Sequence, residues 1–403
     1  MMPSSGSTFP LDSAEAAPTS VSARLDSLDV LRGLAVLMIF VVNIKMMASG
    51  YNHYGERTLY TGPYDQGIGY FHNVFVHGKF VTIFTALFGA GLVLLLNRER
   101  PVPLPIVARR LFWLAVFGAL HLVFIREGDI LAKYALVGFV AIPLVNLRGS
   151  WLLLLGVGGQ AALFVASIVF PVDYGEEPLL WRSDSDMHLE VQRVMLGSIA
   201  DQISARLDTV EFYFVDLFLR GRGWFGTLSI MMMGMGLFKI GFLTGKLPRQ
   251  TYWATAAIGA ACLVPITLYT PLNWGALPNA DIILNAAWTF NQFGGAAAWS
   301  ALTVGLVSAG WKAKALSAAG RMAFTIYIAQ SVIGLLLFSS LGLGLFGQLS
   351  LGELTIITLV TTVFFLIMSP MWLSRFRFGP LEWVWRSLTY GRRQPLLRKS
   401  VSV

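Results

Sequence analysis

The sequence predicts an all-α protein, a polytopic membrane helix bundle of about ten transmembrane helices with both termini in the cytoplasm. Hydrophobic residues make up 55% of the chain and charged residues only 13%, whereas roughly a quarter of the residues in a soluble domain are charged. Apolar runs of roughly 20 residues, the length that crosses a bilayer, recur along the chain. Arg and Lys collect in every second loop between these runs. Together these three observations predict an integral membrane protein.

The first element is a tail, residues 1–27, which is rich in Ser, Ala, Pro and Thr. It lacks a basic segment followed by an apolar core, so it does not have the pattern of a cleaved signal peptide. We therefore expect a disordered cytoplasmic tail. The single cysteine, Cys262, lies in an apolar stretch, and one cysteine cannot form an internal disulfide.

The N-terminal half of the membrane region, residues 28–171, holds five predicted helices. The first opens with Asp29–Gly33, where the long stem of Arg32 lets its charge reach the headgroups, and it approaches the outer face at Asn43. Only Glu127–Asp129 separates the third helix from the fourth, which predicts an antiparallel hairpin with its turn at one membrane face.

Three further segments follow. Residues 172–222 are acidic in their first half and predict a periplasmic segment. Residues 223–374 hold five more helices, and residues 375–403, with aromatic residues among arginines, predict an interfacial helix and tail on anionic lipid. The ten predicted spans are 28–49, 71–97, 105–126, 130–147, 151–171, 223–245, 251–271, 282–308, 318–340 and 353–374.

The net charge of +8 predicts orientation. With ten spans, the basic loops and the basic tail all fall on one side, which is then the cytoplasm. These residues are spread over several short loops, so a nucleic-acid partner is not expected. The basic residues that set the orientation are Arg98, Arg100, Arg109, Arg110, Arg148, Lys246, Arg249, Lys312, Lys314, Arg321, Arg375, Arg377, Arg386, Arg392, Arg393, Arg398 and Lys399.

Ionisable side chains near the outer face predict a site, because such groups inside a membrane mark pathways or binding sites by default. We expect the catalytic candidates His121, Asp129, Lys79 and Asn43 to meet there. A histidine oriented by an aspartate can act as a general base. The alternatives are a packing histidine, an aspartate that only caps the fourth helix, and a lysine that snorkels.

Other polar residues are candidates for binding. Arg126 is a candidate for an anionic acceptor, and Tyr134 is a candidate for substrate binding. Tyr327 and Gln330 are candidates for a polar cavity, with interhelical hydrogen bonds as the slightly stronger alternative. On the inner side, Arg109 and Arg110 are candidates for the phosphates of coenzyme A, with a pure topology role as the stronger alternative. No metal-binding spacing and no phosphate loop occurs in the sequence, so neither a metal site nor ATP-driven work is expected.

Several motifs resemble those of the YeiB-like family of bacterial inner-membrane proteins. They occur in the same order over nearly the whole chain after the tail. They are Asp29–Gly33 with Asn43, Lys79–Phe80 leading to Leu87–Gly91, His121 followed by Gly128–Leu131 and Tyr134–Gly138, Gly320–Ala323 with Thr325, Tyr327 and Gln330, and Phe378–Arg386.

The resemblance implies a multi-pass protein of the bacterial inner membrane whose N-terminal half is similar to transmembrane acyltransferases. That group includes heparan-α-glucosaminide acetyltransferase and the sugar O-acetylating enzymes of bacterial envelopes, in which a histidine is the expected base. This chain departs from the sugar O-acetylating pattern, because Asn43 stands near where a histidine would end the first helix. We therefore expect His121 to be the base, with His53 in reserve.

The function that follows is acyl transfer from a cytoplasmic acyl-CoA-type donor to a glycan or lipid acceptor of the envelope, with no permanently bound cofactor. Export or transport of a small anionic or lipid-linked solute is the first alternative. A non-enzymatic membrane sensor is the second. A groove that reaches His121 favours the enzyme, a two-sided cavity between matching halves favours transport, and a closed polar cluster favours a structural role.

Overall fold

The computed structural model describes residues 26–49, 59, 61–97, 99–170, 186–218, 222–272 and 280–398. Regular structure in these residues is helical, apart from an isolated bridge between Phe376 and Leu397. The helices are α1 (Asp26–Ser49), α2 (Asp65–Phe75), α3 (Lys79–Leu96), α4 (Leu104–Phe124), α5 (Leu131–Ala141), the 3-10 helix η4 (Ile142–Asn146), α6 (Gly149–Val169), α8 (Asp186–Leu196), α9 (Ile199–Phe218), α10 (Arg222–Lys239), α11 (Arg249–Ala261), α12 (Val264–Leu272), α13 (Ala280–Ser308), α14 (Lys314–Arg321), α15 (Ala323–Phe338), α16 (Leu351–Arg375) and α17 (Pro380–Tyr390).

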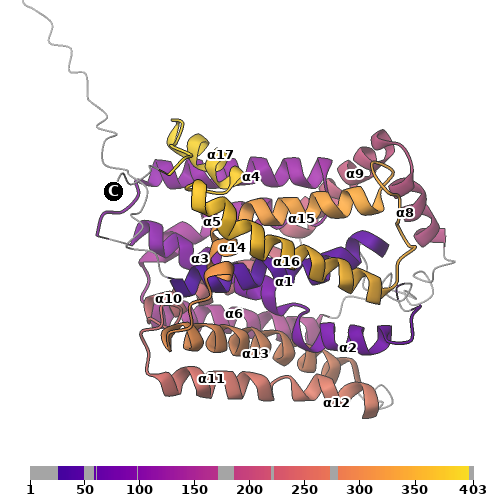
Figure 1. Cartoon of the computed structure of the whole chain (residues 1–403). Helices are drawn as coiled ribbons and strands as arrows, with labels where there is room; N and C mark the ends of the chain where they lie inside the picture. The colour runs from indigo at the N-terminus through magenta and orange to yellow at the C-terminus, as the bar shows by residue number, and fades with distance from the viewer. Residues whose placement is uncertain are drawn as a thin grey trace, which may run out of the picture.

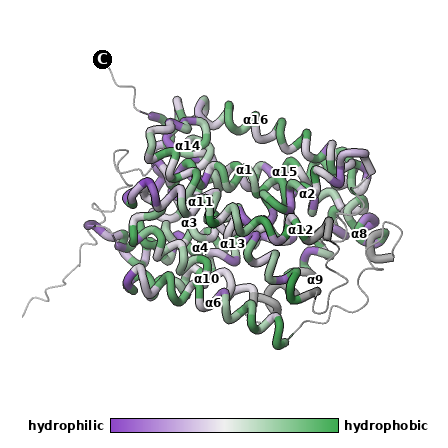
Figure 2. The backbone as a smooth tube through the Cα atoms, turned by 90° about the horizontal axis from the view of Figure 1, so that it is seen from below, coloured by the Kyte–Doolittle hydropathy of each residue, from purple (hydrophilic) through white to green (hydrophobic). Residues whose placement is uncertain are grey.

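The long helices run roughly parallel or antiparallel to one another (Figure 1). α14 and α17 lie at one end of this bundle, and α8 and α9 lie at the other. Hydrophobic residues dominate the long helices, as Figure 2 shows. The arrangement is that of a helical membrane protein, with a helical cap over one end.

Helices occupy all ten ranges in which spans are predicted. Six helices or continuous helix pairs among the described residues are long and apolar enough to cross a membrane, or seven if α14 and α15, which are bent by 80° at their junction, form one span. The α5–η4 segment is apolar but shorter. A helical membrane bundle is therefore supported, whereas ten crossings and cytoplasmic termini stay predictions. The predicted tail, 1–27, lies almost wholly outside the described residues.

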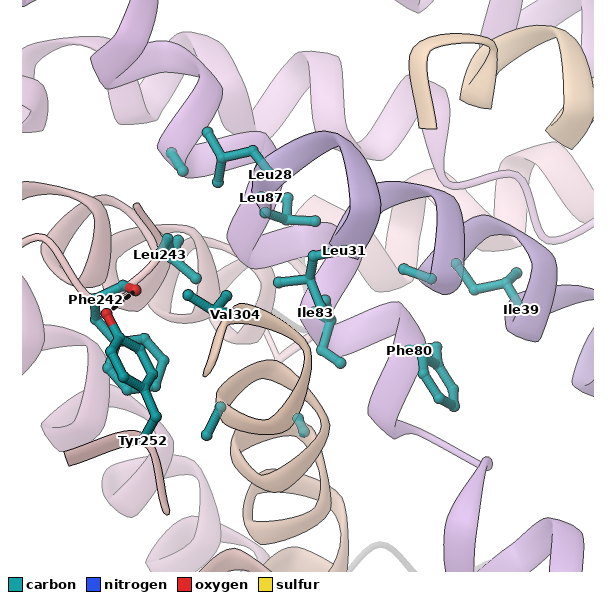
Figure 3. Packing of buried hydrophobic residues seen from close by; sticks show 14 of the residues in the cluster. Leu28, Leu31, Ile39, Phe80, Ile83, Leu87, Phe242, Leu243, Tyr252 and Val304 are labelled. Carbon is teal, nitrogen blue, oxygen red and sulfur yellow. Dashed lines mark hydrogen bonds between the residues drawn. The ribbon is translucent and has the colours of Figure 1, made fainter. Parts of the chain in front are cut away.

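The bundle is held by close packing around α1 and α3. Leu31 of α1 packs with Phe80 and Ile83 of α3, and the cluster continues to α13 and to Tyr252, whose hydroxyl donates to the Phe242 carbonyl at 2.9 Å (Figure 3). Apolar contacts between membrane helices gain little from the hydrophobic effect, because lipid is as apolar as the partner helix. Dispersion between well-fitted surfaces, and small residues that allow backbones to approach, must therefore supply the stability.

The glycines of two sequence motifs lie at such an approach. A Cβ atom at Gly33 of α1 would overlap the Leu316 carbonyl oxygen of α14, and one at Gly320 would overlap the Asp29 carbonyl oxygen. Each motif glycine therefore faces the backbone of the other helix. This explains physically why the Asp29–Gly33 and Gly320–Ala323 motifs occur together: the two helices cross there at backbone contact.

The predicted C-terminal helix forms as α17, but it is docked against the bundle. The indole nitrogen of Trp385 donates to the Arg110 carbonyl of α4 at 2.9 Å. The Glu382 carboxylate accepts from the backbone nitrogens of Phe324 and Thr325 at 2.8 and 3.1 Å and from the Thr325 hydroxyl at 2.6 Å. α17 therefore supplies the anion that satisfies the free N–H groups at the start of α15.

Candidate functional site

The α4–α5 hairpin brings His121 and Asp129 together. His121 lies in the last turn of α4, and Asp129 lies in the turn that leads into α5; His121 Nδ1 is 2.9 Å from Asp129 Oδ1. The second carboxylate oxygen of Asp129 accepts from the Ala132 backbone nitrogen at 2.6 Å. A Cβ atom at Gly118 would overlap that same nitrogen, so a glycine lets the two helices approach closely enough for the pair to form. Asp129 thus binds the start of α5 and the histidine together.

This hydrogen bond determines which nitrogen of His121 is available. In a neutral imidazole whose Nδ1 donates to Asp129, the lone pair is on Nε2. That Nε2 atom is buried and has no hydrogen-bond partner among the described residues. The Tyr327 ring lies with its centroid 5.2 Å from that of the His121 ring. The imidazole therefore lies beside α15, with a carboxylate on its Nδ1 side and an available nitrogen at Nε2.

Gln330 completes this polar cluster. It lies about one turn beyond Tyr327 on α15, it is buried, and within the described chain neither its amide nitrogen nor its amide oxygen has a hydrogen-bond partner. Buried amide groups are nearly always satisfied, so such a group indicates a place for water or a ligand. We define the His121 cluster as His121, Asp129, Tyr327 and Gln330.

A pocket of about 340 Å³ lies one helical turn beyond this cluster. Its walls include residues of α1 and α15 and the residue directly after α4. Each follows a polar residue by three or four positions, which keeps it on the same face of the helix, about 5 Å further along. The pairs are Asn43 and Met46, His121 and Ile125, and Gln330 and Gly334. All three helices begin near α14 and α17 and run toward the end of the bundle where α8 and α9 lie (Figure 1). Residues of α8 and α9 also line the pocket.

The predicted Asn43 therefore belongs with the His121 cluster by its position, although no hydrogen bond of its side chain is assigned. It is half-buried and lies one turn before Met46 and Met47, which line the pocket. Arg126 also lines the pocket and is buried, with its Nη2 atom 3.6 Å from the Met46 sulfur. The structure thus brings six of the predicted residues, the four of the His121 cluster with Asn43 and Arg126, around one pocket end.

Lys79 belongs to a different cluster. Its ammonium group donates to the Asn73 carbonyl of α2 at 2.8 Å, and its stem packs against Gly295 of α13. Asn291 lies one turn before Gly295 on the same face, and no partner for its buried amide occurs in the described part of the chain. His72 of α2 is buried on this side as well. We define the Lys79 cluster as Lys79, His72, Lys45 and Asn291; no hydrogen bond or ring contact between described residues links it to His121.

α1 separates the two clusters. Lys45 follows Asn43 by two residues, which turns its side chain by about 200° around the helix axis. Lys45 is buried and lies close enough to His72 of α2 to act on it electrostatically. The expectation that all outer polar residues gather in one site is therefore corrected: helix rotation divides them between two sites.

The remaining predicted residues have structural partners. The Tyr134 hydroxyl is hydrogen-bonded to the Thr85 hydroxyl, which joins α5 to α3. The Arg110 guanidinium lies 3.6 Å from the centroid of the Trp385 ring, and Arg109 Nη1 donates to the Thr389 carbonyl at 3.4 Å. Both arginines therefore attach α17 to α4, about 18 Å along α4 from His121. A coenzyme A role for them stays a prediction.

Comparison with known proteins places the chain in a family. The model of the family described as "Protein of unknown function (DUF418)" matches residues 237–392. The chain is 30% identical to "Uncharacterized protein YeiB" of Escherichia coli over 388 residues, which covers 93% of this chain and 98% of that protein. The chain belongs to the YeiB-like family. It is also 26% identical to "Uncharacterized protein YxaH" of Bacillus subtilis over 95% of this chain and 98% of that protein.

The matched family region carries only one side of the pocket of this YeiB-like protein. Residues 237–392 include the pocket residues Gly334, Leu335 and Phe346, whereas Met46, Arg126 and Arg206 lie outside this range. The similarity to the YeiB and YxaH proteins runs through both halves, so both walls of the pocket lie within the matched length. The site is thus made by the whole YeiB-like chain and not by one segment.

Some residues of this site escaped prediction. Arg206 of α9 lines the pocket, and Gly118 lets α4 meet α5. The sequence contains an indication of the role of Gly118, since this glycine lies one turn before His121 in an apolar helix. It contains no indication that Arg206 lines the pocket. His53, the reserve base, lies outside the described residues. Within those residues no group of three metal-ligating side chains occurs.

Proposed function

We propose that this YeiB-like membrane protein is a transmembrane acyltransferase that moves an acyl group from an acyl-CoA-type donor to a hydroxyl-bearing envelope acceptor. The observation that carries the proposal is the Nε2 atom of His121, which is buried, without a partner among the described residues, and backed by Asp129 one turn below a pocket. A general base needs this combination of an orienting carboxylate and a free lone pair.

The proposed reaction is direct acyl transfer. His121 Nε2 takes the proton of the acceptor hydroxyl as the oxygen attacks the thioester carbonyl, so a carbon–oxygen bond forms and the carbon–sulfur bond then breaks. The departing thiolate takes the proton from the imidazolium and leaves as coenzyme A thiol. Asp129 holds the ring and stabilises the imidazolium. Asn43 and Arg126 are the proposed donors toward the oxyanion or an anionic part of the acceptor.

The proposal places the pocket at the periplasmic face of a bacterial inner membrane, where an envelope acceptor enters. The donor approaches from the cytoplasmic end, near Arg109 and Arg110. Basic residues from α1, α4 and α17 gather at that end, where Arg32 and Arg386 act electrostatically on Arg110. The positive-inside rule supports this orientation.

One observation favours the transport alternative. α14 and α15 form a helix pair bent by 80°, and broken helices whose N-termini face an anionic substrate are typical of transporters. Here, however, the N-terminus of α15 already binds the chain's own Glu382 carboxylate. The broken helix therefore has an internal ligand, which weakens the transport alternative relative to the enzyme.

The test is an acyl-transfer assay on the full chain purified in a neutral detergent. It uses radiolabelled acetyl-CoA and longer acyl-CoA donors with a panel of hydroxyl-bearing glycans and lipids. We expect transfer by the native protein and a fall of about 10²- to 10⁴-fold in His121→Gln, because a general base contributes this much. His72→Gln is the matched control, since it removes the buried histidine of the Lys79 cluster, and transfer should persist. Equal transfer by the native and His121→Gln proteins, or no transfer to any acceptor, would overturn the proposal.

A further inference from the structure

The walls of the pocket are mostly apolar. α1, α15 and the chain that follows α15 contribute side chains without charge, and α8 contributes apolar side chains together with Glu190. The pocket volume of about 340 Å³ is within the range of small-molecule sites. The wall formed by α8 and α9 is fastened to the end of α15 by Ser340, whose hydroxyl accepts from Gln202 Nε2 at 2.9 Å. The apolar lining residues are Met46, Met47, Val191, Val194, Leu335 and Phe346.

One cation in this apolar lining has no acidic partner among the described residues. Arg126 is only 6% exposed, and its assigned side-chain contact is the Met46 sulfur at 3.6 Å. A thioether is a weak acceptor for a guanidinium that carries five N–H donors. A buried arginine without a carboxylate or phosphate partner is costly. The Arg126 side chain is therefore built to receive an anion from the pocket.

The other charges around the pocket already have partners or lie at its rim. Arg206 donates to the Phe124 carbonyl and to Gln202 Oε1, both at 3.3 Å, and Glu127 lies close enough to act on it. Glu190 forms a two-pronged ion pair with Arg193 at 2.7 and 2.9 Å. Asp208 is exposed. These carboxylates leave Arg126 as the place where an anionic ligand meets a positive charge.

We propose that this pocket binds an amphiphile: its anionic head, a phosphate or a carboxylate, is held by Arg126, and its apolar chain lies along the methionine, valine and leucine side chains. The exposed apolar residue Phe124 directly precedes the lining residue Ile125, and exposed Leu336 directly follows the lining residue Leu335, so the rim of the pocket borders the surface that faces lipid. A lipid-borne ligand reaches it from the bilayer. That this amphiphile is the acceptor for acyl transfer rests on the proposed function, whereas its binding does not.

The test measures binding without turnover. The full chain in a neutral maltoside detergent is titrated with lysophosphatidylglycerol, a long-chain fatty acid, a monoacylglycerol of the same chain length and inorganic phosphate, and binding is followed by the shift in thermal unfolding and by native mass spectrometry. We expect the two anionic amphiphiles to bind at least tenfold more tightly than the monoacylglycerol or phosphate. Preference between the two distinguishes a phosphate head from a carboxylate head.

Two variants connect binding to the pocket. Arg126→Gln should weaken binding of the anionic amphiphiles at least tenfold, while the matched control Arg193→Gln, which removes an exposed arginine already paired with Glu190, should leave it unchanged. Val194→Trp, on the α8 wall, should block every amphiphile by filling the pocket, and it tests the site even if Arg126→Gln folds poorly.

The inference is overturned if phosphate or the neutral monoacylglycerol binds as tightly as the anionic amphiphiles, or if binding survives in Val194→Trp. Its failure differs from failure of the proposed function. Anionic amphiphiles that bind while no acyl transfer occurs support the site and count against the enzyme. Acyl transfer by a protein that binds none of these amphiphiles supports the enzyme and overturns the site.

Discussion

The two polar clusters on either side of α1 use buried ionisable groups in different ways. In the Lys79 cluster the Lys79 ammonium group donates a hydrogen bond to the backbone carbonyl of Asn73, which attaches α3 to α2. In the His121 cluster, Nδ1 of the imidazole is hydrogen-bonded to the Asp129 carboxylate. Its Nε2 atom has no partner in the described residues and lies one turn from a pocket. A carbonyl can only fix a lysine, whereas a carboxylate both orients a base and stabilises its charged form. The difference supports a fastening role for the Lys79 cluster and the proposed chemistry at the His121 cluster.

The largest expected effect is that of Asp129→Ala. It removes the acceptor of His121 and of the Ala132 backbone nitrogen, so the unfolding free energy should fall by about 3 kcal/mol or more and acyl transfer should be lost. Thermal unfolding in detergent and the transfer assay measure the two losses. Asp129→Asn is the matched variant, because it keeps an oxygen for Ala132 but not the charge: it should unfold nearly as the native protein does yet transfer poorly. Full transfer by Asp129→Asn would contradict the base role.

The next effect compares glycines that support the two clusters. A Cβ atom at Gly118 would overlap backbone at Ala132, whereas one at Gly295 would meet the flexible Lys79 stem at 2.9 Å. We therefore expect Gly118→Ala to lower the unfolding free energy by about 1 to 3 kcal/mol, and Gly295→Ala to cost less. Gly91→Ala is the control, because nothing lies within 4 Å of its Cβ, and alanine should stabilise the helix. An equal cost at Gly118 and Gly295 would refute the tight α4–α5 contact.

A smaller effect concerns pH and the carboxylate of Glu382. Unlike Asp129, which is paired with a histidine, Glu382 has only neutral hydrogen-bond donors as assigned partners. Burial raises the pKa of Glu382 above its ordinary value of 4.5, although the donors at Phe324 and Thr325 act against this. The folded state then holds the Glu382 proton more tightly than the unfolded state, so stability falls as the pH rises from 4.5 through the raised pKa. Unfolding temperatures across this pH range measure the slope. Glu382→Gln should flatten the dependence of unfolding temperature on pH. An unchanged slope in that variant would mean that another group causes the pH dependence.

The smallest expected effect is that of Lys79→Met. Methionine keeps most of the apolar stem and removes a buried charge, and such replacements are often neutral or stabilising. The unfolding temperature should stay the same or rise slightly, and acyl transfer and amphiphile binding should persist. If transfer instead falls as far as in His121→Gln, Lys79 acts in the same reaction and the contrast between the clusters is wrong.

The sequence by itself determined the helices and the His121–Asp129 pair. Apolar runs of membrane length are local patterns, so helices occupy all ten predicted ranges. The histidine and the aspartate are also close in sequence: a three-residue link between two predicted spans forces a hairpin, and the pair lies across its turn. The contact between Asp129 and His121, the proposed base, could therefore be predicted without knowing how the rest of the bundle packs.

Only the tertiary structure decided which other polar residues join that pair. The Tyr327 ring reaches His121 from about two hundred residues away. α8 and α9 close the pocket, and Lys79 packs against Gly295 of α13. A membrane helix is apolar on nearly every face, so its sequence gives little indication of how it is rotated about its axis. That rotation is set by glycine crossings such as Gly33 with Gly320, which bring two segments together at backbone contact, and it decides whether a polar residue faces a pocket, a carbonyl or lipid.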